Sequence, residues 1–286
     1  MITHPEKVLF PEDGITKGDL AAYYEALGPV MLSHIRGRPI TMERYHRGVG
    51  SKGFFQKNVV KGFPDWLARV EVPKKGGSFH APLAGDTRSL LWLVNQNSIT
   101  LHVWTSRTPN LDYPDLCVFD LDPMQDEPGV LRATALALRA LLLELGLESF
   151  IKTSGSKGFH IAVPLDRTSH YGEVARFGDA VGRVLVERDP EHLTQEFAKV
   201  DRAGRIYIDT GRNGYGATFA APYAVRPKAG APVSAPCTWE EVADGRALPT
   251  TFNLRGMAKR VDQVGDPWGT MRAQSLTPAI ERLTVR

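Results

Sequence analysis

The chain has 286 residues, of which 42% are hydrophobic and 23% charged, and its formal net charge is +3. This composition is that of a globular protein and excludes an intrinsically disordered one. The length is enough for one large domain or two modest ones, each with a core. The small positive charge permits a polyanionic partner without requiring one, so any case for nucleic-acid binding has to rest on local clusters of charge.

Cysteine usage and the N-terminal residues bear on the compartment. Cys117 and Cys237 have neither metal-ligand spacing nor the density of a disulfide framework, which suits a reducing environment. We expect both to be small buried apolar residues. The first residues, MITHPEKVLF, contain no apolar signal core, and no stretch approaches the roughly 18 apolar residues of a membrane span. We therefore expect a soluble cytoplasmic protein with no membrane partner.

Hydrophobic periodicity predicts helices and strands along the chain. Helices are expected over 17–35, 129–145 and 171–188. The second has start signals in Asp126, Glu127 and Pro128 and a stop signal in Gly146. Strands are expected over 100–104, 116–122, 149–154, 159–164 and 205–209.

The order of these elements predicts a fold class. From residue 116 onward it reads strand, helix, strand, strand, helix, strand, which is the split βαβ (RRM-like) unit with a four-stranded sheet and helices on one face. The region before residue 100 mixes helix, basic loops and short strands. We expect an α+β fold in which an N-terminal α/β lobe (1–108) packs with an RRM-like lobe (109–286), and the boundary lies near 105–114.

Two aspartates stand at the end of the apolar run VFDLDP, residues 118–123. Asp120 and Asp122 are two residues apart on a strand, so they project from the same face, about 6–7 Å apart at the backbone. Carboxylates that close repel each other unless one is protonated or both meet a cation. Mg²⁺ and Mn²⁺ are the usual cations for oxygen ligands. The alternative is a pair of solvated strand-end acids before a turn.

A third acid, Asp209, ends the apolar strand in IYID. Three strand-end carboxylates that converge can hold two metal ions, which is the arrangement that clamps the attacking and leaving oxygens of a phosphoryl transfer. We therefore expect Asp120, Asp122 and Asp209 to form a catalytic site for two divalent ions.

The glycine-rich segment KTSGSKGFHIAVP, residues 152–164, lies between the acidic pair and Asp209. Gly155 and Gly158 allow a turn with exposed backbone N–H groups, and Ser154, Ser156 and Lys157 add hydroxyl donors and a positive charge. The P-loop pattern is absent. We interpret the segment as a grip on a polyphosphate; a plain hairpin turn is the alternative.

Basic residues gather between 199 and 228, and a histidine interrupts an apolar strand. The basic residues suit a triphosphate and a nucleic-acid backbone, although a solvated basic face is the alternative for any one of them. His102, in TLHVW, has a structural role as its alternative. The basic residues are Lys199, Arg202, Arg205, Arg212, Arg226 and Lys228.

Taken together, the motifs resemble the polymerase domain of bacterial DNA ligase D, in the archaeo-eukaryotic primase superfamily. The resemblance covers nearly the whole chain as one polymerase domain, 1–286. It is carried by an ordered set: KVLFP, GITKGDLAAYY, GFFQKN, LHVW, VFDLDP, TSGSKGFHIAVPL, YIDTGRNGYGAT and APYAVRP.

The resemblance implies roles for individual residues. Asp120, Asp122 and Asp209 match the catalytic metal ligands. The incoming nucleotide would be held by Ser154, Lys157 and His160, with His102, Arg202, Arg226 and Lys228. Lys7 and Lys17 match two lysines that hold a 5′-phosphate, and Phe54 and Phe55 match aromatic residues that stack at the template, for which base stacking gives a physical reason.

Two positions depart from the family pattern. His4 stands where the family often has Asn, three residues before Lys7, and Lys228 stands where the family's RxR has its second Arg. Lysine keeps the charge but loses the bidentate fork.

The implied activity is nucleotidyl transfer: addition of NTPs or dNTPs to a DNA primer 3′-hydroxyl with two Mn²⁺ or Mg²⁺ ions. The implied setting is gap filling and end extension in double-strand break repair by non-homologous end joining, near the nucleoid. Its partners would be gapped or broken duplex DNA with a 5′-phosphate, nucleoside triphosphates, Ku and a DNA ligase.

Two other readings stay open from the sequence. FDLDP also resembles the first motif of haloacid-dehalogenase phosphatases, although Met124 departs from that motif. The chain could also be a non-catalytic nucleic-acid-binding relative, although binding alone gives no reason to cluster acids against a polyanion.

Overall fold

The structure, a computed structural model, describes residues 2–284. The chain forms two compact units, each built from three stretches. One unit comprises the chain up to Pro109 with Thr218–Ala235 and Phe252–Asp266, and the other comprises Asn110–Ala217, Pro236–Thr251 and the chain from Pro267 onward. The functional division into lobes 1–108 and 109–286 stays a prediction.

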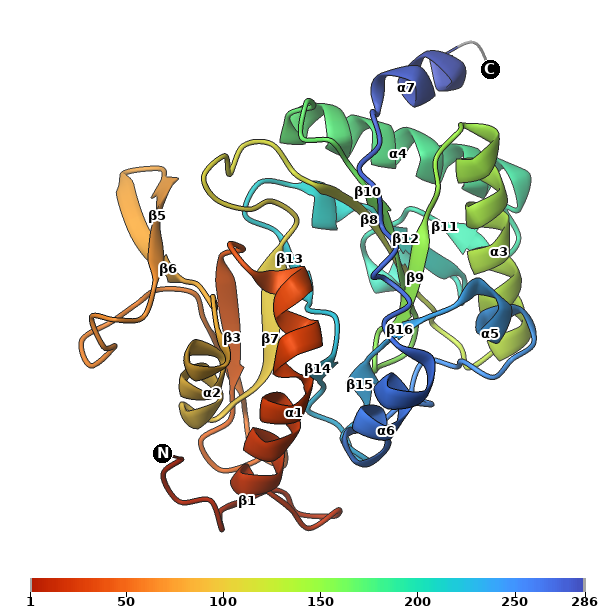
Figure 1. The fold of residues 1–286 in the computed structure, drawn as a ribbon. Helices are drawn as coiled ribbons and strands as arrows, with labels where there is room; N and C mark the ends of the chain where they lie inside the picture. The colour runs from red at the N-terminus through yellow and green to blue at the C-terminus, as the bar shows by residue number, and fades with distance from the viewer. Residues whose placement is uncertain (1, 285–286) are drawn as a thin grey trace. The chain divides into compact units, whose positions relative to one another are not determined.

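The second unit is built on a six-stranded sheet with the strand order β11-β12-β8-β10-β9-β16 (Figure 1). Its four central strands are antiparallel and have the order of a split βαβ unit, as predicted, and β11 and β16 add an edge strand on each side. The strands are β8 (Leu116–Asp122), β9 (Phe150–Thr153), β10 (Phe159–Pro164), β11 (Leu193–Thr194), β12 (Ile206–Asp209) and β16 (Pro236–Cys237).

Alternation along β8 separates core from site. Cys117, Phe119 and Leu121 are fully buried. Burial raises the pKa of the Cys117 thiol, and the negative charge of Asp179 on α4 (Tyr171–Arg188) raises it further. The helix therefore covers this face of the sheet, as α4 also packs on β8. Since side chains alternate along a strand, Asp120 and Asp122 lie on the opposite face.

Helix α3 (Pro128–Glu144) follows the acidic strand and begins where the sequence predicts. Pro128 occupies its first turn, where the missing N–H costs nothing. Gly146, just beyond the C-cap, has a φ of +80°, which ends the helix in the backbone region that glycine favours. The unit also contains α5 (Trp239–Ala243) and α7 (Thr277–Thr284).

The first unit has a four-stranded sheet with the order β13-β7-β3-β4. Helices α1 (Lys17–Ile35) and α2 (Thr87–Asn95) pack against each other, and a hairpin of β5 and β6 extends away from them (Figure 1). The remaining elements of this unit are β1 (Val8–Phe10), β2 (Ile15–Thr16), β3 (Ile40–Arg44), β4 (Phe54–Gln56), β5 (Arg69–Lys74), β6 (Gly77–Pro82), β7 (Ser98–Trp104), β13 (Thr218–Ala220), β14 (Ala224–Val225), β15 (Val233–Ser234) and α6 (Leu254–Val264).

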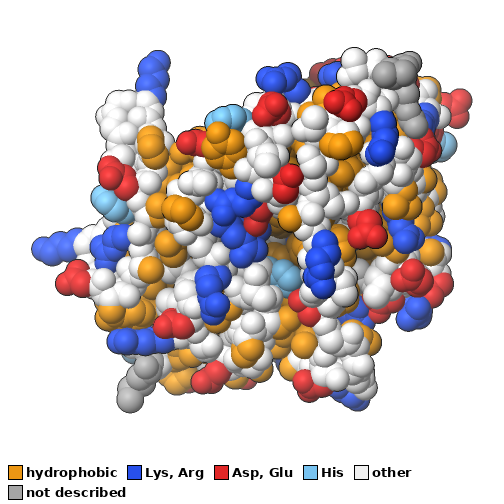
Figure 2. Space-filling view, turned by 45° about the horizontal axis from the view of Figure 1, so that its top comes forward, with side chains coloured by type: hydrophobic (Ala, Val, Ile, Leu, Met, Phe, Trp, Pro, Cys, Tyr) orange, Lys and Arg blue, Asp and Glu red, His pale blue; other side chains and the backbone are white. Residues whose placement is uncertain are grey.

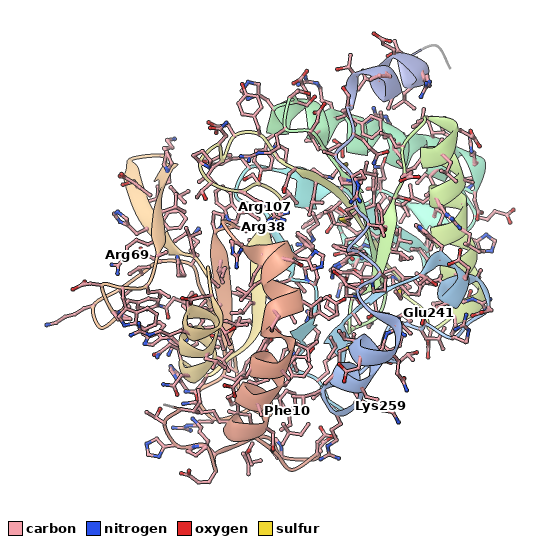
Figure 3. The ribbon with its side chains drawn as sticks, in the orientation of Figure 1. Phe10, Arg38, Arg69, Arg107, Glu241 and Lys259 are labelled. Carbon is pink, nitrogen blue, oxygen red and sulfur yellow. The ribbon has the colours of Figure 1, made fainter. Side chains whose placement is uncertain are left out.

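Side chains cap both ends of α1. Thr16 and Asp19 form a reciprocal capping box at its start. At its end Arg38 and Arg107 lie side by side (Figure 3) and donate to the last carbonyls: Arg38 Nε to His34 O at 2.8 Å, and Arg107 Nη2 to the same oxygen at 3.1 Å. Cations at a helix C-terminus also complement its dipole.

Basic and acidic side chains are interspersed on the surface, as Figure 2 shows for one face. Within residues 2–284, no helix combines the length and the apolar character that crossing a bilayer requires.

Candidate functional site

The three aspartates predicted to converge lie on adjacent strands. Asp209 of β12 is directly opposite Asp120 of β8 in the antiparallel register, and directly opposite residues share a face. Asp122 lies two residues further along β8, on that same face. The side chains of Asp120 and Asp209 are 14% and 17% exposed, whereas that of Asp122 is 41% exposed. The sheet therefore gathers all three carboxylates, two of them in partly desolvated positions.

The same register continues across two further strands. His160 of β10 is opposite Asp120, and Lys152 of β9 is opposite His160. Lys152, His160, Asp120 and Asp209 thus form one row across the sheet. Within it Lys152 Nζ lies 2.7 Å from His160 Nδ1, and His160 Nε2 lies 3.4 Å from Asp120 Oδ1. Burial, together with the nearby Lys152, lowers the pKa of His160 to about 4 despite Asp120, so the ring is neutral at neutral pH.

Arg212 bridges two of the acids. Its Nη2 lies 3.1 Å from Asp120 Oδ2 and 3.2 Å from Asp209 Oδ2. Burial alone would raise the pKa of Asp120, but His160 and Arg212 hold it well below its usual range. Burial raises the pKa of Asp209, and the nearby Asp120 carboxylate also raises it. The charge of Arg212 lowers this pKa but does not cancel the rise. The single positive charge of Arg212 therefore does not fully compensate the two carboxylates of Asp120 and Asp209.

A short 3-10 helix, Gly211–Asn213, places Arg212 at this position. Asn213 is fully buried. Its Nδ2 donates to Val118 O at 2.8 Å, and its Oδ1 accepts from Val118 N at 2.7 Å. The side-chain amide of Asn213 thereby satisfies both backbone groups of Val118, as a neighbouring strand would. It holds the turn against β8 two residues before Asp120.

Arg202 connects Asp122 to the loop before β12. Its Nη1 donates to Asp122 Oδ2 at 2.9 Å, and its other nitrogens donate to Glu196 O at 3.1 Å and Phe197 O at 2.9 Å. The guanidinium also lies 4.1 Å from the centre of the Tyr207 ring, a cation–π distance. Arg202 is 5% exposed, so it is a fixed part of the acidic site.

The glycine-rich turn adjoins the row, and a side chain within the turn binds two of its own N–H groups. The Ser154 Oγ accepts from the N–H groups of Ser156 and Gly158, both at 3.1 Å. Two of the N–H groups expected to face a phosphate are therefore engaged inside the turn. A side chain at Gly158 would place its Cβ 1.6 Å from Leu121 O, so the turn packs directly on the backbone of β8.

Lys157, at the tip of this turn, is exposed. With Ser156 it lines a cavity of about 500 Å³ whose other walls include Pro123, Gln125 and Leu248. Of the predicted phosphate contacts, Lys157 is the side chain most accessible to a ligand, whereas Ser154 and His160 are buried.

The other predicted nucleotide residues lie in the first unit. His102 Nε2 is 2.9 Å from Glu43 Oε2, and Tyr45 donates to Glu43 Oε1 at 2.9 Å. Burial alone would raise the pKa of Glu43, but the bond with His102 and the charge of Arg226 lower it. Arg226 and Lys228 follow β14, where Lys228 N donates to Arg226 O at 2.9 Å.

The predicted template and 5′-phosphate residues also belong to the first unit. Phe54 and Phe55 on β4 are 39% and 65% exposed, and Phe55 lies edge-on to His102 with centroids 5.4 Å apart. Lys17 N donates to Lys7 O at 2.8 Å. Burial and the neighbouring Lys7 charge lower the pKa of Lys17, whose side chain is buried.

Four residues of these sites were not assigned from the sequence. Arg212 was counted only in the basic group, although the motif DTGRNG places it three residues after Asp209. Strand pairing places Lys152 on the same face of the sheet as His160, but a lysine inside an apolar strand does not by itself indicate a role in the site. Glu43 and Asn213 act through contacts between distant segments, for which the sequence carries no local pattern.

Comparison with known proteins decides the family. Residues 16–268 match the family described as LigD, primase-polymerase domain. The chain belongs to this family. The LigD multifunctional non-homologous end joining protein of Mycolicibacterium smegmatis is 33% identical over 99% of this chain, and that of Pseudomonas aeruginosa is 35% identical over 93%. The matches cover 37% and 32% of those proteins, so the chain spans about a third of each.

A solved structure supports the LigD assignment. The polymerase domain of Mycobacterium tuberculosis ligase D, determined in complex with DNA, matches with a TM-score of 0.88 and 32% identity, covering 94% of this chain and 96% of that one. The α+β fold expected from the sequence is confirmed. The haloacid-dehalogenase reading of the aspartate pair is not favoured, because the whole fold around the pair is that of the LigD polymerase domain.

Proposed function

We propose that this LigD-type domain is a DNA-dependent nucleotidyltransferase that adds NTPs or dNTPs to a primer 3′-hydroxyl. The observation that carries the proposal is the convergence of Asp120, Asp122 and Asp209 on one face of the sheet, beside the Ser154–Gly158 turn. Family membership supplies the reaction class, since a primase-polymerase domain joins nucleotides.

The donor set suits a hard divalent cation, Mn²⁺ or Mg²⁺. All three side chains offer carboxylate oxygens, the ligands such ions prefer, and Arg212 already acts as a shared cation for two of them. As the side chains stand, no three His, Cys, Asp or Glu residues between 2 and 284 are arranged to hold a metal. We infer that Asp120, Asp122 and Asp209 would hold the ions, two per site, after Arg212 releases its carboxylates.

Bound ions would neutralise the triphosphate and lower the pKa of the attacking hydroxyl. The chain itself contributes the positions of the phosphate-binding groups. Lys157 reaches solvent at the tip of the turn and can meet a phosphate by charge. His160 offers a fixed ring next to Asp120. Arg202 is bound to Asp122, and the five N–H donors of a guanidinium group allow it to keep that pair in its expected role at the nucleotide.

We further propose that the domain fills gaps and extends ends in non-homologous end joining, because its LigD relatives are named for that process. Duplex DNA is the proposed polymer partner, as for the ligase D domain solved with DNA, and Ku and a DNA ligase are the proposed protein partners. Lys7 and Lys17 would receive a 5′-phosphate, with Phe54 and Phe55 at the template. His102, Arg226 and Lys228 of the first unit are likewise proposed to serve nucleotide binding.

The decisive experiment supplies gapped duplexes, with and without a 5′-phosphate, together with ribo- or deoxyribonucleotides and Mn²⁺. We expect template-directed extension that Asp122→Ala abolishes while DNA binding persists, because Asp122 would hold cations and not DNA. Asp262→Ala, at an exposed position of α6, is the matched control. Binding without extension by the wild-type protein would favour the non-catalytic relative instead.

A further inference from the structure

Lys152 is a lysine with no exposed surface in the middle of the catalytic sheet. Lysine is almost never fully buried without a partner, because its ammonium group loses its hydration. Its place in the row, opposite His160 on the neighbouring strand, is therefore costly to maintain. The proposed reaction assigns it no task, since it cannot reach solvent or a ligand.

The hydrogen bond between Lys152 and His160 has a defined donor and a defined acceptor. An ammonium group has three donors and no acceptor. At 2.7 Å from Lys152 Nζ, His160 Nδ1 accepts this hydrogen bond through its lone pair. In the neutral ring the proton then resides on Nε2.

The opposite edge of the ring meets the acidic site. His160 Nε2 lies 3.4 Å from Asp120 Oδ1, so an Nε2 proton points toward a carboxylate. The other tautomer would place a lone pair against that negative charge. Asp120 Oδ2 is held separately by Arg212. Both oxygens of this carboxylate are thus oriented by donors, one of which depends on the tautomer of His160.

We propose that Lys152 is a positioning residue: its hydrogen bond to His160 Nδ1 fixes the Nε2–H tautomer and, through His160, the orientation of the Asp120 carboxylate. The alternative is a lysine that only fills the core. The catalytic consequence rests on the proposed nucleotidyl transfer, whereas the tautomer does not.

The direct test is the tautomer of His160 in the wild-type protein, read near neutral pH from long-range ¹H–¹⁵N correlation spectra of ¹⁵N-histidine-labelled protein. His160→Gln identifies the resonances by their loss. We expect a proton on Nε2. A proton on Nδ1 would overturn the proposal, whatever the activity of the sample.

Two substitutions separate positioning from filling. Lys152→Met keeps the length of the side chain but removes the donor, so the ring should lose its single tautomer and kcat should fall about 10- to 100-fold, the usual loss when a partner behind a functional group is removed. Lys152→Gln removes the charge but keeps an N–H donor, and it should retain the Nε2–H signature and most of kcat. Lys259→Met, exposed on α6, is the control for a lysine-to-methionine change.

The outcomes are separable even where a variant fails to fold. Equal spectra and equal kcat for folded Lys152→Met and wild type would show that the lysine only fills space. If Lys152→Met does not give a cooperative melting transition, the wild-type spectrum and Lys152→Gln decide the question. A wild-type protein with the expected tautomer but no nucleotide transfer would refute the proposed function and leave the assignment of the hydrogen bond intact.

Discussion

The Arg212 bridge gives a prediction whose size follows from the geometry. Replacing it by methionine leaves Asp120 and Asp209 opposite each other without their shared cation. Each pair, at 3.1 and 3.2 Å, corresponds to about 5 kcal/mol of attraction at an effective dielectric constant of about 20. Desolvation offsets most of this attraction, and the Arg212 side chain is 38% exposed, which weakens it further. We expect Arg212→Met to lower the free energy of unfolding by about 1–3 kcal/mol.

The assay is thermal unfolding of wild type and variant in chelator and in Mn²⁺. In chelator the variant should melt at a lower temperature. Added Mn²⁺ should raise its melting temperature more than that of the wild type, because no guanidinium then competes for the carboxylates. Arg188→Met, which removes an exposed pair with Glu144, is the control and should change little. Wild-type melting of Arg212→Met in chelator, with no larger response to Mn²⁺, would refute the reasoning.

Three further predictions test other parts of the structure. Gly158→Ala should prevent the turn from packing on β8, since the added Cβ would lie 1.6 Å from Leu121 O; we expect a loss of several kcal/mol, and normal urea unfolding would contradict it. Glu43→Gln should destabilise the protein at neutral pH, because a carboxyl group whose pKa is lowered by folding stabilises the protein only while it is ionised. The difference in unfolding free energy from wild type should fade as pH falls from 4.5 through the lowered folded pKa of Glu43. A difference that persists in urea unfolding at lower pH would count against the pair with His102. Lys17→Met should reduce the preference for 5′-phosphorylated over unphosphorylated gaps about tenfold in binding titrations, because a hydrogen bond to a charged group contributes about 1.5 kcal/mol; an unchanged preference would remove Lys17 from the proposed phosphate site.

Hydrophobic pattern was sufficient to predict the central architecture. The apolar runs that end in Asp122 and Asp209 are strands β8 and β12, and the element order gave the observed order of the four central strands. The helix predicted over 129–145 is observed as Pro128–Glu144, because proline and glycine mark its ends by backbone geometry alone. These features depend on neighbouring residues in the chain, which a sequence displays directly.

Features that depend on distant contacts were not predictable in this way. The edge strands β11 and β16 have two residues each, too few to show a period. The sequence marks Ser154 as a donor to phosphate, but it does not show that the same hydroxyl also accepts from two N–H groups of the turn. The importance of Arg212 and Lys152 appears only when register places them beside Asp120 and His160. Both are charged residues for which the sequence shows no partner, and the motifs assigned no role to either of them.

The interleaving of the chain has a practical consequence for dissecting the protein. Strand β13 belongs to the sheet of the first unit although it follows Asp209 in sequence, and β16 completes the sheet of the second unit further on. A fragment cut after Pro109 would lack part of one sheet, and the remainder would carry that part with no place to fold. Deletion mapping is therefore the wrong tool for assigning DNA and nucleotide contacts here; single side-chain replacements in the intact chain are the appropriate one.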